Sequence, residues 1–302
     1  MRVLVTGASG MIGSAVCDAL LARGDEVVAL SRDPTRAART NPTASWHPWD
    51  PARERPPAAA LESIHAVVNL VGESIDQRLT ADAKERILDS RARATKNLVD
   101  ALISTQARPR ALVSQSAIGY YGDHGEAIVD ESTPPGGDFL AGVCARWEGA
   151  AAPAADAGIR LVTLRTAPVL DPDGGLLGRL LLPFRLGVGG PLAGGSWYMP
   201  WIHRDDEVGM ILWALDTADA AGTFNSCAPH PVTNREFSKA LGRALRRPAI
   251  APAPKLAAAL LLGREMAEAA TASIRAVPRR ALDAGYPFRF GEIEPALRDL
   301  VG

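Results

Sequence analysis

The sequence has few cysteines and no long apolar run, and each shortage excludes classes of protein. Its 302 residues include three cysteines, Cys17, Cys144 and Cys227, which form no C-x-x-C. Because the number is odd and the spacing wide, we expect neither a disulfide framework nor a zinc knuckle, and we expect a reducing compartment. The longest apolar stretch, Leu256–Leu262, is far shorter than a membrane-spanning helix requires.

An excess of charge of either sign is also missing. Lys and Arg total 33 and Asp and Glu total 34, for a net charge of -1. Nucleic acids and anionic membranes usually attract a basic surface, so we expect neither as a partner. We expect a small-molecule substrate instead, and a monomer or homodimer. The first expected strand begins almost at Met1, which predicts no signal peptide and a cytoplasmic protein.

Lysine and clustered histidine are scarce as well. Only four of the 33 basic residues are lysines, and this scarcity bears on catalysis below. The five histidines have no spacing typical of metal ligands, so no metal is expected.

Short apolar segments and helical segments alternate through the first half of the chain. Strands are expected at Val3–Val5, Glu26–Leu30, around Ala44–His47, Ala66–Val71, Ala111–Ser114 and Leu161–Leu164. Helices are expected between them, at Ile12–Leu21, from about Thr80 to Thr105, and at Asp138–Ala157. This alternation predicts an α/β fold with a doubly wound parallel sheet of the Rossmann type.

The texture changes after about residue 170, where glycine pairs punctuate a region rich in loops. Two further helices are expected near Asp205–Ala214 and Asn234–Arg246. We therefore predict an NAD(P)-binding Rossmann domain over residues 1–170, with some later segments returning to it. Residues 171–302 form a smaller substrate-side region, including a small C-terminal domain at about 249–297.

The strongest motif is a G-x-x-G-x-x-G between the first strand and the first helix. Gly7 permits a tight exit from the strand, Gly10 a close approach of backbone to a pyrophosphate, and Gly13 close packing of helix on sheet. The free N–H groups of the helix start would hold the phosphates. The predicted contacts in this loop are Gly7, Ser9, Gly10, Met11, Ile12 and Gly13.

The end of the second strand indicates which cofactor binds. An acidic residue there would favour the ribose of NAD, whereas Arg favours the 2′-phosphate of NADP. Arg32 can offer several N–H donors to a phosphate and Ser31 a hydroxyl, which predicts NADP with NAD as the alternative. Asp33, the next residue, is acidic and would instead favour the ribose of NAD. Arg36 follows closely, as does Arg39, and for both an ordinary solvated face is the favoured interpretation.

With these residues placed, the chain resembles the extended short-chain dehydrogenase/reductase superfamily. It is most similar to the atypical epimerase group described as SDR39U1-like. The segments that carry the resemblance are Asn69–Glu73, Ser90–Arg91, Ser114–Gly122, Cys144–Glu148, Leu182–Gly187, Trp201–His203, Asn225–Asn234 and Pro278–Leu297.

The resemblance implies a cofactor that lies along the carboxyl ends of the strands. It places Leu70, Val71 and Gly72 beneath the riboses, and Arg91 near a phosphate or ribose. Ser114 to Ser116 would close over the nicotinamide, with Pro168 and Val169 beside its carboxamide. The alternatives are sheet packing for Leu70 and a surface ion pair for Arg91.

One part of the superfamily pattern is missing. Its members use a Tyr four residues before a Lys on one helix face, where the cation lowers the pKa of the tyrosine. None of the four tyrosines here has a Lys at that spacing. Alignment on Glu148 places Leu140 and Cys144 where the pair should stand.

Several residues remain as candidates for proton transfer. Ser116 matches the active-site serine, and Tyr121 or, less favoured, Tyr120 could replace the missing acid. A tyrosine without a nearby cation keeps a pKa of about 10 and is a poor base at neutral pH. Weaker candidates are His203, beside an Asp205 that could cap a helix, and an acidic loop for which solvation is favoured, namely Glu126, Asp130 and Glu131.

Two functions are consistent with the sequence. The favoured one is an NADP-dependent oxidoreductase or epimerase acting on a small hydroxyl, carbonyl or nucleotide-sugar substrate. The alternative is an NADP(H)-binding sensor or structural protein that has lost turnover with the Tyr–Lys pair.

Overall fold

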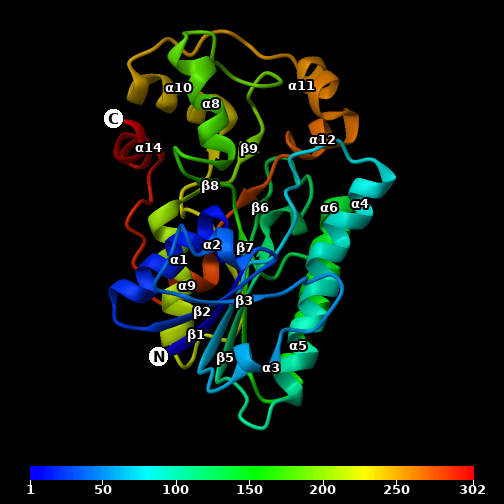
Figure 1. Cartoon of the computed structure of the whole chain (residues 1–302). Helices are drawn as coiled ribbons and strands as arrows, with labels where there is room; N and C mark the ends of the chain where they lie inside the picture. Colours follow the sequence, from blue (N-terminus) through cyan, green and yellow to red (C-terminus); the bar gives the residue numbers. More distant parts are fainter.

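The computed structural model describes the backbone of residues 1–302 and all side chains except those at 257, 258, 261 and 262. A sheet with helices on both faces fills the lower part of the molecule, and a smaller, mostly helical region lies above it (Figure 1). The apolar stretch expected at Leu256–Leu262 falls in helix α11 (Lys255–Leu262), where those four side chains lie outside the described residues. Among the described residues, no helix combines the length and apolarity needed to cross a bilayer.

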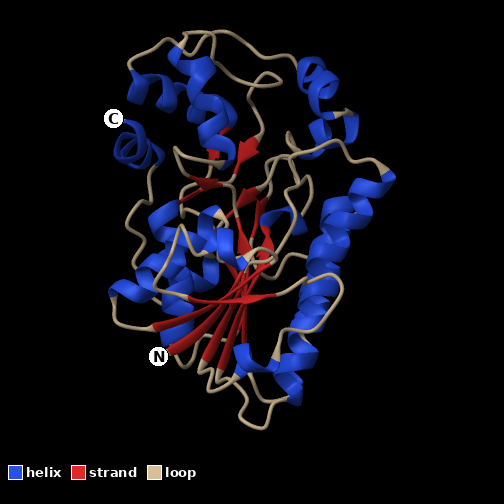
Figure 2. Ribbon diagram, in the orientation of Figure 1, coloured by secondary structure: helices blue, strands red, loops and turns tan.

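The central sheet has seven strands in the order β11-β7-β5-β4-β1-β2-β3, and every neighbouring pair is parallel (Figure 2). Its first strands are almost entirely apolar and buried, as expected of strands covered on both faces. The predicted doubly wound Rossmann sheet is confirmed. The strands are β1 (Arg2–Thr6), β2 (Glu26–Ser31), β3 (Ser45–Pro48), β4 (Ala66–Asn69), β5 (Ala111–Ala117), β7 (Arg160–Thr166) and β11 (Gly222–Ser226).

Strand β4 ends at Asn69, two residues before the predicted end at Val71. The Asn69 side chain accepts a hydrogen bond from Thr6 Oγ1 at 2.7 Å and donates one to Thr95 Oγ1 at 2.9 Å. These bonds satisfy the amide at the strand end, and the chain turns away from the sheet. Leu70 and Val71 therefore lie in a loop at the carboxyl edge.

Helices cover each face of the sheet. On one face lie α1 (Met11–Ala22) and α9 (Arg204–Asp216), which share an apolar core with Val3 and Val5 (Figure 1). On the other face Leu4 packs in a second core with Leu98 and Leu102. The helices on that side are α4 (Ala81–Leu88), α5 (Ala94–Ser104), α6 (Phe139–Ala151) and α7 (Pro153–Asp156).

The long helix predicted from about Thr80 to Thr105 is interrupted by a π-helical turn, η1 (Asp89–Arg93). Such turns insert a residue into the helix and often lie at functional sites. Here the turn directs Ser90 and Arg91 toward the loop after β4. Ser90 Oγ accepts a hydrogen bond from the backbone N–H of Glu73 at 3.0 Å.

The second region has its own core, formed by α8 (Gly175–Arg185), α10 (Asn234–Leu245) and α14 (Ile293–Val301). Three pairs of short strands connect it to the sheet region: β8 (Val169–Leu170) with β10 (Ile202–His203), β9 (Tyr198–Met199) with β12 (Val232–Thr233), and β6 (Ile128–Val129) with β13 (Arg275–Ala276). The remaining short elements are α2 (Pro34–Ala37), α3 (Ala58–Leu61), η2 (Ile118–Tyr120), α12 (Arg264–Ala269) and α13 (Arg279–Asp283).

Helix α9 is capped by His203, so the predicted capping role of Asp205 is wrong. His203 belongs to β10 and keeps an extended backbone, and its Nδ1 accepts a hydrogen bond from the Asp205 N–H at 3.0 Å. Asp205 lies within the first turn and pairs with Arg289 at 2.8 Å. The pairing of β10 with β8 places the imidazole, rather than the carboxylate, at the helix start.

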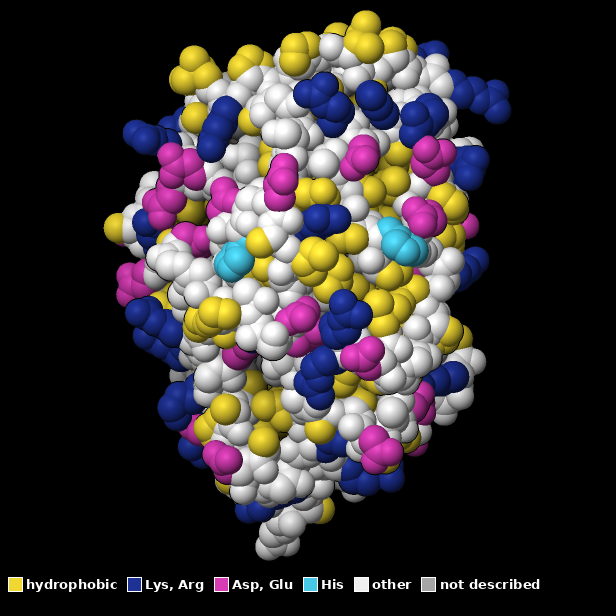
Figure 3. All heavy atoms as spheres, turned by 180° about the vertical axis from the view of Figure 1, so that it is seen from behind, with side chains coloured by type: hydrophobic (Ala, Val, Ile, Leu, Met, Phe, Trp, Pro, Cys, Tyr) yellow, Lys and Arg dark blue, Asp and Glu magenta, His cyan; other side chains and the backbone are white. Residues whose placement is uncertain are grey.

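Exposed apolar side chains concentrate at the end of the second region, around α8 and α11. In Figure 3 apolar atoms cover this end of the molecule, with Lys and Arg side chains directly below them. The second region thus exposes large aliphatic side chains of the type that mostly lie buried in the two cores of the sheet region. Those described with high exposure are Leu182, Leu186, Val188, Ile250, Leu256 and Leu260.

Candidate functional site

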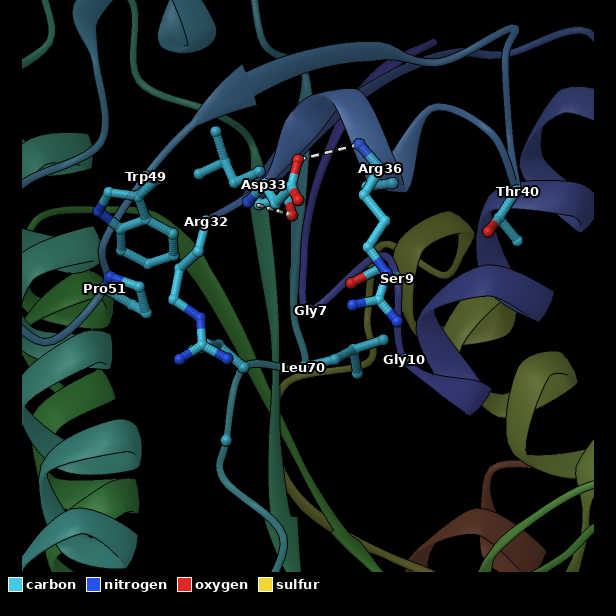
Figure 4. Close-up of a pocket in the computed structure, with 15 residues that line it drawn as sticks. Gly7, Ser9, Gly10, Arg32, Asp33, Arg36, Thr40, Trp49, Pro51 and Leu70 are labelled. Carbon is cyan, nitrogen blue, oxygen red and sulfur yellow. Dashed lines mark hydrogen bonds between the residues drawn. The ribbon is translucent and has the colours of Figure 1, made fainter.

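A cavity of about 500 Å³ opens at the carboxyl ends of β1, β2 and β4. This is the edge at which doubly wound sheets bind their ligands. Three loops form most of its wall: the glycine loop after β1, residues 31–33 after β2 and residues 70–72 after β4 (Figure 4). We call it the dinucleotide cavity.

The glycine loop is packed so closely that side chains are excluded at two positions. Gly7 has a φ of +66°, and a Cβ there would lie 2.6 Å from the Leu70 carbonyl oxygen. A Cβ on Gly13 would lie 2.2 Å from the Gly7 oxygen. Gly10 is less restricted, at 3.2 Å, and as the N-cap of α1 it provides no side chain to bond the free N–H groups of the helix start. An anion can approach those groups.

The other predicted residues of this loop differ in position. Ser9 lines the dinucleotide cavity. Met11 begins helix α1, and its sulfur lies 3.0 Å from the place of a Cβ on Gly174. Ile12 packs against the core beneath. Neither Met11 nor Ile12 lines the dinucleotide cavity, and their contact with a cofactor remains a prediction.

Two arginines line the cavity, Arg32 directly after β2 and Arg36 in helix α2. Arg32 lies on the side of Trp49 and Pro51, whereas Arg36 extends toward Ser9 (Figure 4). Arg36 is exposed, as the solvated face favoured by the sequence requires, and it also borders the cavity. Arg39 is absent from the cavity lining and is exposed.

Asp33, the acidic residue that would favour NAD, forms its hydrogen bonds within its own turn. Its Oδ1 accepts a hydrogen bond from the Arg36 N–H at 3.0 Å and caps the short helix α2. Its own N–H donates to Ser31 Oγ at 3.1 Å. The carboxylate is thus part of the structure that holds Arg36 in place.

The cavity lining also includes residues to which the sequence assigned no cofactor role, among them Thr40 and Trp49. Both line the dinucleotide cavity, and the Trp49 indole donates to the Glu54 carbonyl oxygen at 2.9 Å. Trp49 follows directly on β3, and its position after a strand end was the available signal. A tryptophan face at this place suits a flat aromatic ring.

Beyond Leu70 and Val71, Arg91 lies against Gly72. A Cβ on Gly72 would be only 3.0 Å from Arg91 Cζ, and the guanidinium also lies over the Trp147 ring at 5.2 Å. Burial lowers the pKa of Arg91. Among the described side chains, Arg91 forms no ion pair, so the surface ion pair considered as its alternative role is not present.

The residues expected near a nicotinamide lie outside the lining of the cavity. Ser114 is buried, and its Oγ accepts a hydrogen bond from Asn69 Nδ2 at 3.3 Å. Val169 is buried in β8, while the carbonyl oxygen of Pro168 bonds to the Ile202 N–H at 3.2 Å. These positions remain predictions.

A second polar group lies beside Ser114, at the end of β5. Ser116 Oγ donates a hydrogen bond to Glu148 Oε1 at 2.7 Å. Glu148 also accepts two bonds from Arg165, each 2.9 Å long, and Arg165 is directly opposite Ser116 on β7. Charge-assisted bonds of this paired form are strong and strict in geometry.

Two tyrosines surround the same arginine. Arg165 Nη1 donates to Tyr121 Oη at 3.0 Å, and its Cζ lies 3.4 Å from the centre of the Tyr120 ring. Tyr121 is fully buried, its hydroxyl donates to Asn225 Oδ1 at 2.7 Å, and burial raises its pKa to about 12. We call this group the serine cluster: Ser116, Glu148, Arg165, Tyr120, Tyr121 and Asn225.

The usual place of the Tyr–Lys pair on α6 holds no proton carrier suited to neutral pH. Cys144 is buried there, and burial raises its pKa to about 12. Two of the four lysines pair elsewhere: Lys84 with Glu265 at 2.7 Å and Lys96 with Asp100.

Two of the acidic-loop candidates have structural partners, whereas Glu126 is exposed, in agreement with the solvated loop that the sequence favours. Glu131 accepts hydrogen bonds from the backbone N–H groups of Asn225 and Arg280, and Asp130 accepts two from Ser132. His203 is buried at the start of α9. Among the residues that the structure describes, no group of His, Cys, Asp or Glu side chains could hold a metal ion.

One buried carboxyl group was not anticipated. Glu207, in the first turn of α9, accepts hydrogen bonds from Thr166 Oγ1 at 3.0 Å and Ser226 Oγ at 2.6 Å. It is fully buried, and burial raises its pKa to about 7. Thr166 ends β7, directly before the loop that contains Pro168.

Comparison with known proteins agrees with this geometry. The description "NAD dependent epimerase/dehydratase family" matches residues 3–227, and a domain of unknown function (DUF1731) matches residues 253–300. The chain belongs to the NAD dependent epimerase/dehydratase family. The resemblance inferred from the sequence motifs is thereby confirmed.

Several members of the epimerase family match over the full chain. The epimerase family protein SDR39U1 of Bos taurus is 38% identical, with all of both chains covered. The epimerase family protein Mb2239 of Mycobacterium bovis is also 38% identical, covering 98% of this chain and 96% of that protein. The crystal structure of human SDR39U1 (isoform2) with NADPH is 36% identical, with a TM-score of 0.90 and coverage of 100% and 99%.

Proposed function

We propose that this epimerase-family chain is an NADP-dependent oxidoreductase or epimerase. Its substrate would be a small hydroxyl or carbonyl compound, or a nucleotide sugar. The observation that carries the proposal is the dinucleotide cavity, in which a glycine loop and two arginines line one space.

The residues present fit this cofactor. A Cβ at Gly7 or Gly13 would overlap backbone, so the loop leaves a cradle of bare amides at the start of α1 for a pyrophosphate. Arg32 and Arg36 supply cations for a 2′-phosphate, and Asp33 is engaged as a cap. The human relative carries NADPH in its crystal structure.

A second candidate is an NADP(H)-binding sensor without turnover. The observation that favours it is the apolar Leu140 and buried Cys144 at the place of the Tyr–Lys pair. Both candidates bind the cofactor, and only the enzyme transfers hydride.

One pair of measurements tests the proposal and separates the two candidates. At a hundredfold excess over its Kd, NADPH should stabilise the fold by about 2.7 kcal/mol, which thermal unfolding would report. Oxidation and reduction are then followed across alcohols, carbonyl compounds and nucleotide sugars. Absence of stabilisation would refute both candidates, and stabilisation without hydride transfer would select the sensor.

We also propose the division of the chain made from its sequence, with a cofactor-binding part over residues 1–170 and a substrate-side region after it. Segments such as β11 and α9 return to the first part. The three cysteines are free and buried, which supports a reducing compartment such as the cytoplasm.

A further inference from the structure

The hydroxyl proton of Ser116 is already committed to a partner inside the protein. A serine hydroxyl has one proton and two lone pairs. Its proton points to Glu148 Oε1, and Arg165 donates two further hydrogen bonds to the same carboxylate. Ser116 therefore offers only lone pairs to a molecule that approaches from elsewhere.

Arg165 is held on several sides, so Glu148 has a fixed position. The guanidinium lies on the Tyr120 ring, bonds to Tyr121 Oη, and is 6% exposed. Tyr121 is in turn fixed by Asn225, whose Nδ2 donates to the Val277 carbonyl oxygen at 3.0 Å. Because each member has a partner, the cluster can keep one arrangement of donors and acceptors.

Strand register places Ser116 close to the dinucleotide cavity. Asn69 at the end of β4 pairs with Ser114 on β5, so Ser116 lies two residues beyond this last pair, at the carboxyl edge of the sheet. The loop that follows β4 lines the cavity at Leu70, Val71 and Gly72. Ser116 is 2% exposed at this edge, and its hydroxyl bonds Glu148 of helix α6.

We propose that Ser116, backed by Glu148 and Arg165, is the proton acceptor for an alcohol substrate and replaces the missing Tyr–Lys pair. The proposal rests on the proposed function. The substrate hydroxyl donates a hydrogen bond to Ser116 Oγ. Before the relay the serine presents its lone pairs to an alcohol, and after the relay its new proton faces the carbonyl product.

The proton transfer balances in a single relay. The oxidised nicotinamide, when bound, accepts the carbinol hydrogen with both electrons of its C–H bond. The O–H electrons form the carbonyl π bond, the hydroxyl proton passes to Ser116 Oγ, and the serine proton passes to Glu148 Oε1. Ser116 is the catalytic residue, and Glu148 and Arg165 are positioning residues that act through it.

Four titratable or charged groups surround Glu148 or its partner: Arg165 on β7, Cys144 on the same helix, and Tyr120 and Tyr121 after β5. Arg165 bonds Glu148 twice and fixes the carboxylate beside Ser116.

The first test locates the Ser116 hydrogen directly. Neutron diffraction from deuterated crystals should place the deuterium of Ser116 Oγ on the line to Glu148 Oε1. A deuterium that points away from Glu148 would overturn the proposal, and this readout requires neither substrate nor turnover.

The second test compares matched secondary alcohols and ketones, such as cyclohexanol and cyclohexanone, within a wider panel that includes UDP-glucose. Ser116→Ala leaves the Glu148–Arg165 pair intact, and it should lower alcohol oxidation with NADP⁺ by about 100-fold or more. Ser116→Thr should restore it. Glu148→Gln should lower kcat for oxidation while NADPH affinity is unchanged, whereas the exposed Glu62→Gln should leave kcat unchanged.

The outcomes distinguish this proposal from the proposed function. Unchanged NADPH affinity in Ser116→Ala and Glu148→Gln, together with the loss of oxidation, supports the relay. An unchanged oxidation rate in a Glu148→Gln variant that remains folded overturns it. A wild type that binds NADPH but oxidises no alcohol of the panel also overturns the relay, while the cofactor assignment stands. Failure to bind NADPH would reject the proposed function itself.

Discussion

The dinucleotide cavity and the serine cluster lie at neighbouring strand ends but are built differently. The cavity is formed largely by backbone and by exposed arginines that few protein groups hold. In the serine cluster five of the six side chains are joined by hydrogen bonds, Tyr120 contacts Arg165 through its ring, and most members are buried. An open site of the first kind can change its ligand contacts without affecting the fold, whereas changes in the second must affect stability.

The largest effect should follow removal of the cation from the serine cluster. Arg165→Met leaves Glu148 without its charge partner in a buried place, and we expect a loss of about 3–5 kcal/mol in unfolding free energy. Urea unfolding measures it. Arg53→Met, at a side chain 86% exposed, is the matched control and should change stability by less than about 1 kcal/mol. Equal losses in both variants would contradict the comparison.

Glu207 extends the comparison to a buried carboxyl group without a cation. Its pKa is raised from 4.5 to about 7, so the folded state keeps a proton that the unfolded chain releases earlier. Stability should therefore fall by about 3 kcal/mol as pH rises from roughly 4.5 to 7. Glu207→Gln lacks this loss. Unfolding free energies of the wild type and of Glu207→Gln are measured over that pH range. A difference between the two that stays constant with pH would contradict the prediction.

In the cavity the expected effects are on binding alone. Arg32→Ala should weaken NADPH by about 10- to 100-fold, the value of a charged hydrogen bond, with little change for NADH or for stability. Fluorescence titration measures both affinities. Arg39→Ala changes a nearby arginine outside the lining and should leave both unchanged. Equal weakening of NADPH and NADH by Arg32→Ala would refute the 2′-phosphate assignment.

The smallest effect is expected at Asp33. Asp33→Ala removes the cap of α2 and should cost about 1 kcal/mol in unfolding free energy. The ratio of NADPH to NADH affinity should not change, because the carboxylate bonds its own turn. A steep rise in that ratio would mean instead that Asp33 reaches the ribose.

The sequence predicted those parts of the fold and site that are formed by residues adjacent in the chain. The glycine loop and Arg32 are visible as short patterns beside a strand, and both line the cavity. Trp49 follows directly on the end of β3, a signal visible in the sequence, whereas Thr40 reaches the same cavity through the path of the chain before β3, which no local pattern encodes. The doubly wound sheet was predictable because its buried strands are short apolar runs.

The serine cluster could not be assembled from sequence alone, because it depends on strand register. Arg165 follows an expected strand that ended at Leu164, and only the pairing of β5 with β7 places it opposite Ser116. Glu148 served as an alignment point, with no partner assigned. A charged residue inside an extended buried strand was the available signal.

The π-helical turn at Asp89–Arg93 has a consequence for the length of this segment. Each residue of an α-helix turns the chain by about 100°. A family member with one residue fewer here would carry a continuous helix, with every side chain after the deletion rotated by that angle relative to α4. Such a chain could keep the hydrogen bond between the Glu73 N–H and Ser90 Oγ, or it could keep the packing of α5, but not both. Insertions and deletions should therefore be rarer in this turn than in the loops on either side.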